Sequence, residues 1–470
     1  MKKMLMALSL TGALLGGSAV VWAEEAASTP ATEQTVAASD TVAETVTTVV
    51  AETTAPAEAA PAPEETPTAD TGDTAWILVS TALVLLMTIP GLALFYGGMV
   101  RKKNVLRTMM FSLSAAILVS LIWVIVGYSL AFSGSGAYVG DLAKAMLNGV
   151  AFDALSGTIP ESLFVIFQMT FAIITVAIIS GSIADRMKYS AFMAFIAIWV
   201  ILVYAPITHW VWAADGWLFK AGALDFAGGT VVHINAGVAG LVAAYMLGKR
   251  TGLGRESMAP HNLTLTVIGA SLIWVGWFGF NGGSALGAGA RASMAILVTQ
   301  VAAAAAAFSW LLVERLIRGK ASVLGGASGA VAGLVVITPA AGFVGVGGAL
   351  IMGLIGGVVC FWGITALKRL LKADDALDAF GLHAVGGIVG AVLTGIFYSD
   401  EIIKAAGVVL APTFAGQLWV QIEGVLATIV YCGVVTFIIL KVIDLVIGIR
   451  VSADDERMGL DLSQHGERIE

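Results

Sequence analysis

The feature that most constrains this chain is a series of eleven apolar segments, each able to supply the roughly 20 residues with which a helix crosses a bilayer. The hydrocarbon core holds no water, so a spanning segment must satisfy its own backbone N–H and C=O groups, as a helix does. We therefore predict an all-α membrane protein of eleven transmembrane helices, the last of them long. The segments are about 75–99, 108–132, 160–183, 190–210, 226–247, 262–281, 292–313, 322–341, 343–367, 379–398 and 415–448.

Composition supports a membrane protein and argues against several other classes. Apolar residues make up 58% and charged residues 12% of the chain, against about 25% charged in soluble domains. The 55 glycines suit helices that pack backbone to backbone in lipid. Cys360 and Cys432 offer neither a disulfide framework nor a CxxC metal site. The sequence shows no phosphate-binding loop, metal cluster or ordered Ser-His-Asp set, so we expect no enzyme activity, cofactor, metal or nucleic-acid partner.

The two ends of the chain differ from the apolar part. Residues 1–23 resemble a secretory signal peptide, with Lys2, Lys3, an apolar run and Ala23 before the acidic start; an uncleaved membrane anchor is the alternative. Residues 24–74 are rich in Ala, Thr, Pro and Glu, a composition that cannot bury enough apolar surface to fold, so we predict a disordered, acidic extracytoplasmic segment. The eleven-helix domain would occupy 75–450 and a cytoplasmic tail 451–470.

Positive charges in the connections give an orientation. Lys and Arg gather on the cytoplasmic side of membrane proteins. Here they concentrate in every second connection, at Arg101, Lys102, Lys103, Arg107, Arg186, Lys188, Lys249, Arg250, Arg255, Arg315, Arg318, Lys320, Lys368, Arg369 and Lys372. The other connections hold Lys144, Lys220, Arg291 and Lys404. We therefore expect an extracytoplasmic N-terminus and a cytoplasmic C-terminus.

An internal repeat relates the first five segments to the next five. Segment one ends GLALFYGG and segment six ends GWFGFNGG, with Gly, Phe and Gly-Gly in register. Segments five and ten share His-x-x-x-Gly-x-x-Gly, beginning at His233 and His383. Five spans per half means that the halves insert upside down relative to each other. Two inverted five-helix repeats followed by a long eleventh helix would bring both histidines to the bilayer centre.

The two histidines are the residues most indicative of function. An ionisable ring inside a span is costly and usually faces an interior pathway, although a purely structural hydrogen-bonded role is the simpler alternative. Neutral imidazoles can share a proton, one donating and one accepting. His209, His261 and His465 lie at segment ends or in the tail, where we expect interfacial or solvated positions.

Acidic and aromatic residues near these spans have structural alternatives. Asp225, which opens segment five, and Asp378, five residues before His383, suit helix N-caps, a reading that we weigh before any role in attracting cations. Phe167 and Phe171 share a helix face. Trp212, in a connection, could offer its ring to a cation.

At this point the sequence resembles a known family. DFAGGTVVHINAGVAGLVAAYMLGKR (225–250) is similar to the signature segment of the Amt/Mep/Rh ammonium transporters. The likeness covers about 76–467 and includes TIPGLALFYGG, FQMTFAIIT, GWFGFNGGSA, LKRLLKADDALDAFGLHAVGGIVG and GLDLSQHGE. The acidic 24–74 extension departs from the family pattern. The resemblance implies a homotrimer in the bacterial cytoplasmic membrane, and a trimeric PII signalling protein as a cytoplasmic partner through Gly459, Asp461, His465 and Gly466.

The resemblance also implies site residues. His233 and His383 match the histidines lining the pore centre, and Phe171 and Phe280 match stacked phenylalanines closing the pore on the outer side. Trp212, Phe171 and Ser284 match an outer vestibule that recruits ammonium. Asp225 matches an acid beside that vestibule, and Phe167 matches a further vestibule aromatic.

A transport mechanism follows as a hypothesis. Carrying a charged ion through an apolar passage costs many kcal/mol, so we expect ammonium to lose its proton near Phe171 and Phe280. Ammonia would then pass His233 and His383 while the proton travels along the pair, making transport electrogenic. The alternatives are a passive ammonia channel, an ammonium sensor acting through PII, and a membrane cytochrome with the two histidines as haem ligands.

Overall fold

The computed structural model describes residues 68–469. Within this range ten helices are long and apolar enough to cross a membrane, and Val323–Ile337 forms a shorter apolar helix. These eleven segments correspond one to one with the eleven predicted from the sequence, so the all-α prediction is confirmed. The expected signal peptide and most of the 24–74 segment lie outside the described residues.

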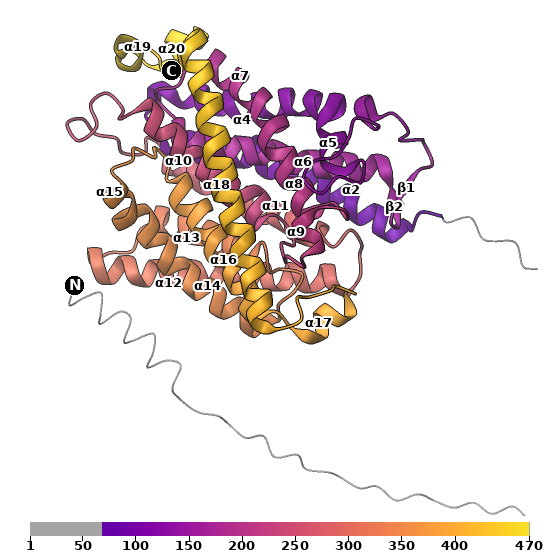
Figure 1. The fold of residues 1–470 in the computed structure, drawn as a ribbon. Helices are drawn as coiled ribbons and strands as arrows, with labels where there is room; N and C mark the ends of the chain where they lie inside the picture. The colour runs from indigo at the N-terminus through magenta and orange to yellow at the C-terminus, as the bar shows by residue number, and fades with distance from the viewer. Residues whose placement is uncertain (1–67, 470) are drawn as a thin grey trace, which may run out of the picture. The chain divides into compact units, whose positions relative to one another are not determined.

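The first five spans are built as follows, in chain order (Figure 1): α2 (Thr71–Leu86), η1 (Met87–Leu92) and α3 (Ala93–Met99); α4 (Val105–Ile122), η3 (Trp123–Gly127) and α5 (Tyr128–Phe132); α6 (Glu161–Ile183); α7 (Tyr189–Trp199), η5 (Val200–Tyr204) and α8 (Ala205–Trp212); and η6 (Gly229–Ile234) with α10 (Asn235–Leu247). The remaining six are α11 (Leu263–Gly283); α12 (Ala290–Arg318); α13 (Val323–Ile337); α14 (Val346–Trp362), η7 (Gly363–Leu367) and α15 (Lys368–Leu371); η8 (Phe380–Ala384) with α16 (Val385–Phe397); and α18 (Phe414–Ile447).

Short elements connect these spans. They are η2 (Lys102–Asn104), η4 (Ala145–Leu147), α9 (Trp217–Lys220), α17 (Asp400–Ala405), α19 (Ala453–Met458), α20 (Leu460–His465) and an antiparallel hairpin of β1 (Leu155–Ser156) and β2 (Ile159–Pro160). Figure 1 shows α18 running between α17 at one end and α19 and α20 at the other. We call the end that carries Trp212 and α17 the Trp212 end, and the end that carries α19 and α20 the tail end.

Several helix boundaries differ from those expected, and two of the differences have a clear local cause. The first helix begins at Thr71, inside the segment expected to be disordered, because the Asp70 carboxylate accepts a hydrogen bond from the Asp73 amide (2.8 Å) and caps it. The α13 helix ends at Ile337 rather than near 341, just before Pro339, which has no amide proton to donate. The turns that follow are buried in protein, where irregular backbone is tolerated at membrane depth.

Packing relates equivalent elements of the two halves. The first span packs on the sixth, through contacts of α2 and α3 with α11. The fifth and tenth spans contact each other reciprocally, α10 on η8 and α16 on η6. A Cβ on Gly237 would lie 2.5 Å from the amide nitrogen of Ala384, and one on the equivalent Gly387 would lie 2.7 Å from the carbonyl oxygen of Gly229. Only glycine therefore lets the two histidine-bearing segments approach this closely.

Candidate functional site

The centre of the structure holds the two histidines predicted to meet. His233 lies on η6 and His383 on η8, each on a single turn of π-helix, and both are buried. Their Nδ1 atoms are 3.2 Å apart, and the ring centroids are 5.3 Å apart. At that distance one nitrogen can donate a hydrogen bond and the other can accept it, so the two neutral rings can share one proton.

The direct contact between the two rings disfavours the haem alternative. A haem with two axial histidines lies between their rings. Here the rings contact each other, with the Nδ1 atoms 3.2 Å apart. The geometry therefore favours a hydrogen-bonded pair over a pair of axial ligands.

His233 is held in place by Trp277 of α11. The indole stacks on the imidazole with centroids 5.3 Å apart and planes 16° apart. The indole Nε1 donates to the Thr338 hydroxyl (2.9 Å), which fixes the Trp277 ring. The Nε2 of His233 is buried and has no hydrogen-bond partner within residues 68–469. It is the polar atom of this ring left available to a guest molecule.

A stack of aromatic rings leads from the histidines toward the Trp212 end. Phe280 lies 6.0 Å from His233 and stacks on Phe171, with centroids 4.3 Å apart. Phe171 makes edge contacts with Trp212 (5.6 Å) and with Phe167 (5.1 Å). The contacts define a series, Trp212, Phe171, Phe280, His233 and His383, in which each ring touches the next. Five separate spans contribute one ring each, and we call this arrangement the ring series.

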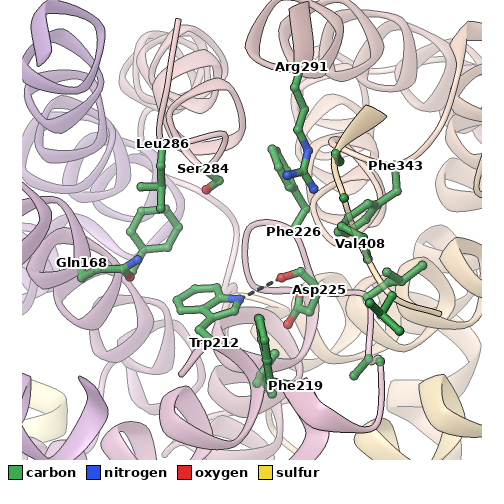
Figure 2. A pocket seen from close by; sticks show the side chains of 18 of the residues that line it. Gln168, Trp212, Phe219, Asp225, Phe226, Ser284, Leu286, Arg291, Phe343 and Val408 are labelled. Atoms are coloured by element: carbon green, nitrogen blue, oxygen red, sulfur yellow. Dashed lines mark hydrogen bonds between the residues drawn. The ribbon is translucent and has the colours of Figure 1, made fainter. Parts of the chain in front are cut away.

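A cavity of about 460 Å³ opens at the Trp212 end of the ring series. Its lining includes Phe171, Trp212, Asp225 and Ser284, as Figure 2 shows for the last three. The Trp212 indole donates to the backbone carbonyl of Asp225 (2.8 Å). The Ser284 hydroxyl donates to the carbonyl of Phe280 (2.8 Å), so its oxygen lone pairs remain free to accept. We call this space the Trp212 cavity.

The carboxylate of Asp225 caps the segment that carries His233. It accepts hydrogen bonds from the backbone amides of Gly228 (2.9 Å), Gly229 (2.5 Å), Thr230 (2.8 Å) and Val231 (3.2 Å), and from the Thr230 hydroxyl. The acid thus satisfies the amides that a helix start leaves unpaired. The capping interpretation of Asp225 agrees with this geometry, and its carboxylate also borders the cavity.

Comparison with known proteins decides the family. A sequence profile described as Ammonium Transporter Family matches residues 75–469. The ammonium transporter of Bacillus subtilis (strain 168) is 52% identical over 399 residues, covering 84% of this chain and 98% of that relative. The chain belongs to the ammonium transporter family.

Solved structures agree with this assignment. The crystal structure of Candida albicans Mep2 matches with a TM-score of 0.78 and 37% identity, over 85% of this chain and 90% of that one. A structure described as a sensor Amt protein matches with a TM-score of 0.78 and 30% identity, over 84% of this chain and 98% of that one. The resemblance read from the sequence is therefore confirmed, and the chain is a multi-pass membrane transporter.

In this ammonium transporter the sequence reasoning missed one acid and misplaced another. Asp375 lies eight residues before His383, as Asp225 lies eight before His233. Its carboxylate accepts from the amides of Phe380 (2.8 Å) and Ala379 (3.2 Å) and from the hydroxyl of Ser182 (2.7 Å). Asp375 is thus the second cap, which the eight-residue spacing could have indicated.

Asp378, which the sequence suggested as the cap, does not cap the His383 segment. Its carboxylate pairs with Lys368 (2.6 Å). Its backbone φ of 62° corresponds to the 109° of Gly228, three residues after the other cap. Burial raises the pKa of Asp378 to about 6; Lys368 opposes this rise and Asp375 adds to it.

On the other side of the histidines the ammonium transporter fold leaves a small apolar space. It is lined by Met87, Leu92, Phe95, Ile174, Ile178, Ile273, Trp277, Val331 and His383. Apolar walls favour a neutral guest over a charged one, because they cannot replace the water around an ion.

The expectation that His209 is interfacial is wrong. Its ring is fully buried at the Trp212 end, with Nδ1 2.9 Å from the carbonyl oxygen of Ala131 and Nε2 2.5 Å from that of Gly136. These contacts tie α8, which ends at Trp212, to α5 and to the connection that follows it. We assign His209 a structural role.

The C-terminal tail docks on the start of α4. The Asp461 carboxylate accepts from the amides of Arg107 (2.8 Å) and Leu106 (3.1 Å). The Lys103 ammonium donates to backbone carbonyls in α19, and the His465 ring packs edge-on against Tyr189 at 5.0 Å. The tail residues predicted to matter for signalling therefore include one that caps a membrane helix.

Proposed function

We propose that this chain transports ammonium across the bacterial cytoplasmic membrane, taking up ammonium at the Trp212 cavity and conducting ammonia past the histidine pair. The observation that carries the proposal is the ring series, which joins a cavity with cation-binding groups to a buried, proton-sharing pair. Family membership supports ammonium as the cargo, since the Bacillus subtilis relative is an ammonium transporter.

Recruitment would use groups that attract a cation without fully replacing its water. The Trp212 and Phe171 rings offer π faces or edges to the cavity, and cation–π attraction is strongest for indole. The Ser284 oxygen can accept an N–H of ammonium, because its own proton is donated to Phe280. Phe167, behind Phe171, supports the angle of that ring. Asp225 acts through the helix start it caps and through the backbone carbonyl that positions Trp212.

Passage would require loss of the charge. Phe171 and Phe280 close the cavity with a face-to-face stack that offers no oxygen to an ion. Desolvating ammonium there costs many kcal/mol, whereas neutral ammonia crosses at much lower cost. Ammonium therefore splits into ammonia and a proton at the stack, and ammonia enters the apolar space beyond.

The proton would be transferred along the two imidazole rings. It adds to Nε2 of His233, the nitrogen without a partner, while the proton shared between the two Nδ1 atoms shifts to His383. His383 then releases a proton from its own Nε2 toward the tail end. One ammonia and one proton cross for each ammonium taken up, so the cycle carries one positive charge and is electrogenic.

Orientation and assembly belong to the same proposal. The distribution of Lys and Arg favours an outward-facing Trp212 end and a cytoplasmic tail end. The family resemblance favours a homotrimer with one pathway per subunit, a cleaved signal peptide over 1–23, and a PII signalling protein as partner of the tail.

The test is electrical recording from reconstituted protein. Wild type should give an ammonium-dependent current that grows with an inside-negative potential, and the His233→Ala/His383→Ala double variant should lose that current. His261→Ala, which removes an imidazole away from the ring series, serves as the control. An unchanged current in the double variant, or wild-type transport insensitive to potential, would contradict the relay.

Two further candidates are separated by the same measurements. A passive ammonia channel would show uptake without current. A sensor acting through a PII-type partner is favoured by the docked tail and by the similarity to a sensor Amt protein. Sensing without flux predicts that the chain fails to restore growth of a transporter-deficient strain on limiting ammonium.

A further inference from the structure

The Trp212 cavity contains a positively charged side chain that the proposed mechanism does not use. Arg291, the second residue of α12, lines the cavity together with Trp212 and Ser284. Figure 2 shows its guanidinium pointing toward Phe226 and Phe343 on the side of the cavity opposite Gln168. Asp225 and Arg291 are the two charged residues in the lining. A fixed cation in a space that takes up a cation needs a physical explanation.

The guanidinium is clamped, not mobile. Its Cζ lies 4.9 Å from the centroid of the Phe226 ring and 5.0 Å from that of Phe343. Its Nε donates to the backbone carbonyl of Gly342 (3.2 Å). Gly342 in turn has no space for a Cβ, because the Phe226 ring occupies it. The charge is therefore held at one position on the cavity wall.

The charge of Arg291 is not neutralised by a neighbour. Across residues 68–469 it makes no ion pair with a carboxylate. The Asp225 carboxylate is already bonded to four backbone amides and a hydroxyl, and the partial positive charge of that helix start offsets part of its own. A cation entering the cavity is therefore weakly attracted by the Asp225 carboxylate, whose charge is partly offset, and repelled by the unpaired Arg291 guanidinium.

Distance makes this charge effective throughout the cavity. A sphere of about 460 Å³ is about 10 Å across. The Debye length is about 8 Å at 0.15 M ionic strength and about 30 Å at 0.01 M. An ammonium ion anywhere in the cavity therefore lies within reach of the guanidinium at low ionic strength.

We propose that Arg291 sets the affinity of the Trp212 cavity for ammonium by repelling the cation and by occupying the Phe226–Phe343 ring pair that would otherwise hold it. The inference rests on the proposed function, since it assumes that ammonium is taken up from this cavity. Ammonium is then left with Trp212, beside the Phe171–Phe280 stack, as its aromatic partner. The same repulsion acts on the ion and not on ammonia, so it favours release of the proton where the pathway begins.

The test compares variants by apparent KM for ammonium, measured as current from reconstituted protein. Arg291→Gln removes the charge and should lower KM about three- to tenfold. Arg291→Lys keeps the charge and should retain a KM near that of wild type. Lys404→Gln, which removes an exposed cation on α17, is the matched control and should leave KM unchanged.

A second measurement needs no variant. Raising ionic strength from about 0.01 M to about 0.15 M with sodium gluconate screens the guanidinium, so the wild-type KM should fall, while Arg291→Gln should lose this dependence. Three results would overturn the inference: a wild-type KM that does not fall, an Arg291→Gln KM equal to wild type, or the same shift in the Lys and Gln variants, which would mean that Arg291 only positions the two rings. Absence of both wild-type current and ammonium uptake would instead refute the proposed function.

Discussion

Asp375 caps the His383 segment as Asp225 caps the His233 segment, each from eight residues upstream. The two acids lie at opposite ends of the molecule, because the halves are inverted. Each carboxylate orders a helix start whose π-turn presents a histidine to the other half. The proton-sharing pair therefore depends on two capping sites that lie outside it.

We expect Asp375→Asn to impair transport about as severely as Asp225→Asn. An amide cannot accept on both sides, so each variant leaves backbone amides unpaired and should cost about 2–4 kcal/mol of stability. Ammonium current and thermal unfolding of the purified protein measure the two effects. Ser182→Ala, which removes one donor to Asp375 and leaves the acid in place, should cost less than either. A fully active Asp375→Asn protein would show that the second cap is dispensable.

Trp277 should act as a positioning residue for His233. Trp277→Phe keeps a ring against the imidazole but loses the bond to Thr338, so we expect about tenfold lower current with little change in KM. Thr338→Val removes the same bond while leaving the indole intact, and should reproduce most of the effect. If Thr338→Val is silent while Trp277→Phe is not, the bulk of the indole matters and the hydrogen bond does not.

The close approach of the two histidine segments should make Gly237 intolerant of a side chain. A methyl group there meets Ala384 at 2.5–2.6 Å, so Gly237→Ala should destabilise the protein by about 1–3 kcal/mol and reduce current by separating the imidazoles. Gly433→Ala is the matched control, because its Cβ would lie an ordinary 3.7 Å from Val238. Thermal unfolding and current recordings compare the two variants; equal behaviour would contradict the packing argument.

Removal of the Asp461 cap should release the tail from α4. Asp461→Ala leaves two amides at the helix start without their acceptor, at a cost of about 1–2 kcal/mol. Limited proteolysis should then cleave the tail faster than in wild type. Asp454→Ala provides the comparison, since that carboxylate is exposed and pairs with Arg457 within the tail. Equal cleavage rates for both variants would mean that Asp461 does not hold the tail.

Ionisation of the Asp378 carboxyl should lower the stability of the folded protein as pH rises. Its pKa of about 6 lies above the ordinary 3.8, so the folded protein binds this proton more tightly than the unfolded chain does. Stability from this group is present below pH 3.8 and is lost as pH rises through 6. The side chain is 30% exposed, so we expect Asp378→Asn to be more stable than wild type by only about 1 kcal/mol at pH 8. The difference in melting temperature between Asp378→Asn and wild type should be smaller at pH 4 than at pH 8. An equal difference at both pH values would contradict the raised pKa of Asp378.

The sequence by itself determined the number and type of the helices and the two residues at their centre. Apolar segments of about 20 residues form helices when they cross a bilayer, because a helix satisfies its backbone hydrogen bonds within the segment. The shared His-x-x-x-Gly-x-x-Gly spacing indicated that His233 and His383 are equivalent, and their proximity followed from inverted insertion. The length of an apolar segment does not fix where its helix begins and ends, however. The first helix begins at Thr71 because Asp70 caps it, and α13 ends at Ile337.

Only the tertiary structure decided which polar residues act together. Asp375 and Asp378 are both acids that lie shortly before His383, so the sequence does not distinguish them as helix caps. The backbone turn between them directs only the Asp375 carboxylate toward the amides of the helix start. His209 lies at a segment end yet is fully buried, because a connection 73 residues away in the chain packs against it. In the sequence, Arg291 is one of several cations in the connections between helices. Only the structure shows that its guanidinium packs against Phe226 and Phe343 in the Trp212 cavity. Such contacts join residues far apart in the chain, and local periodicity carries no information about them.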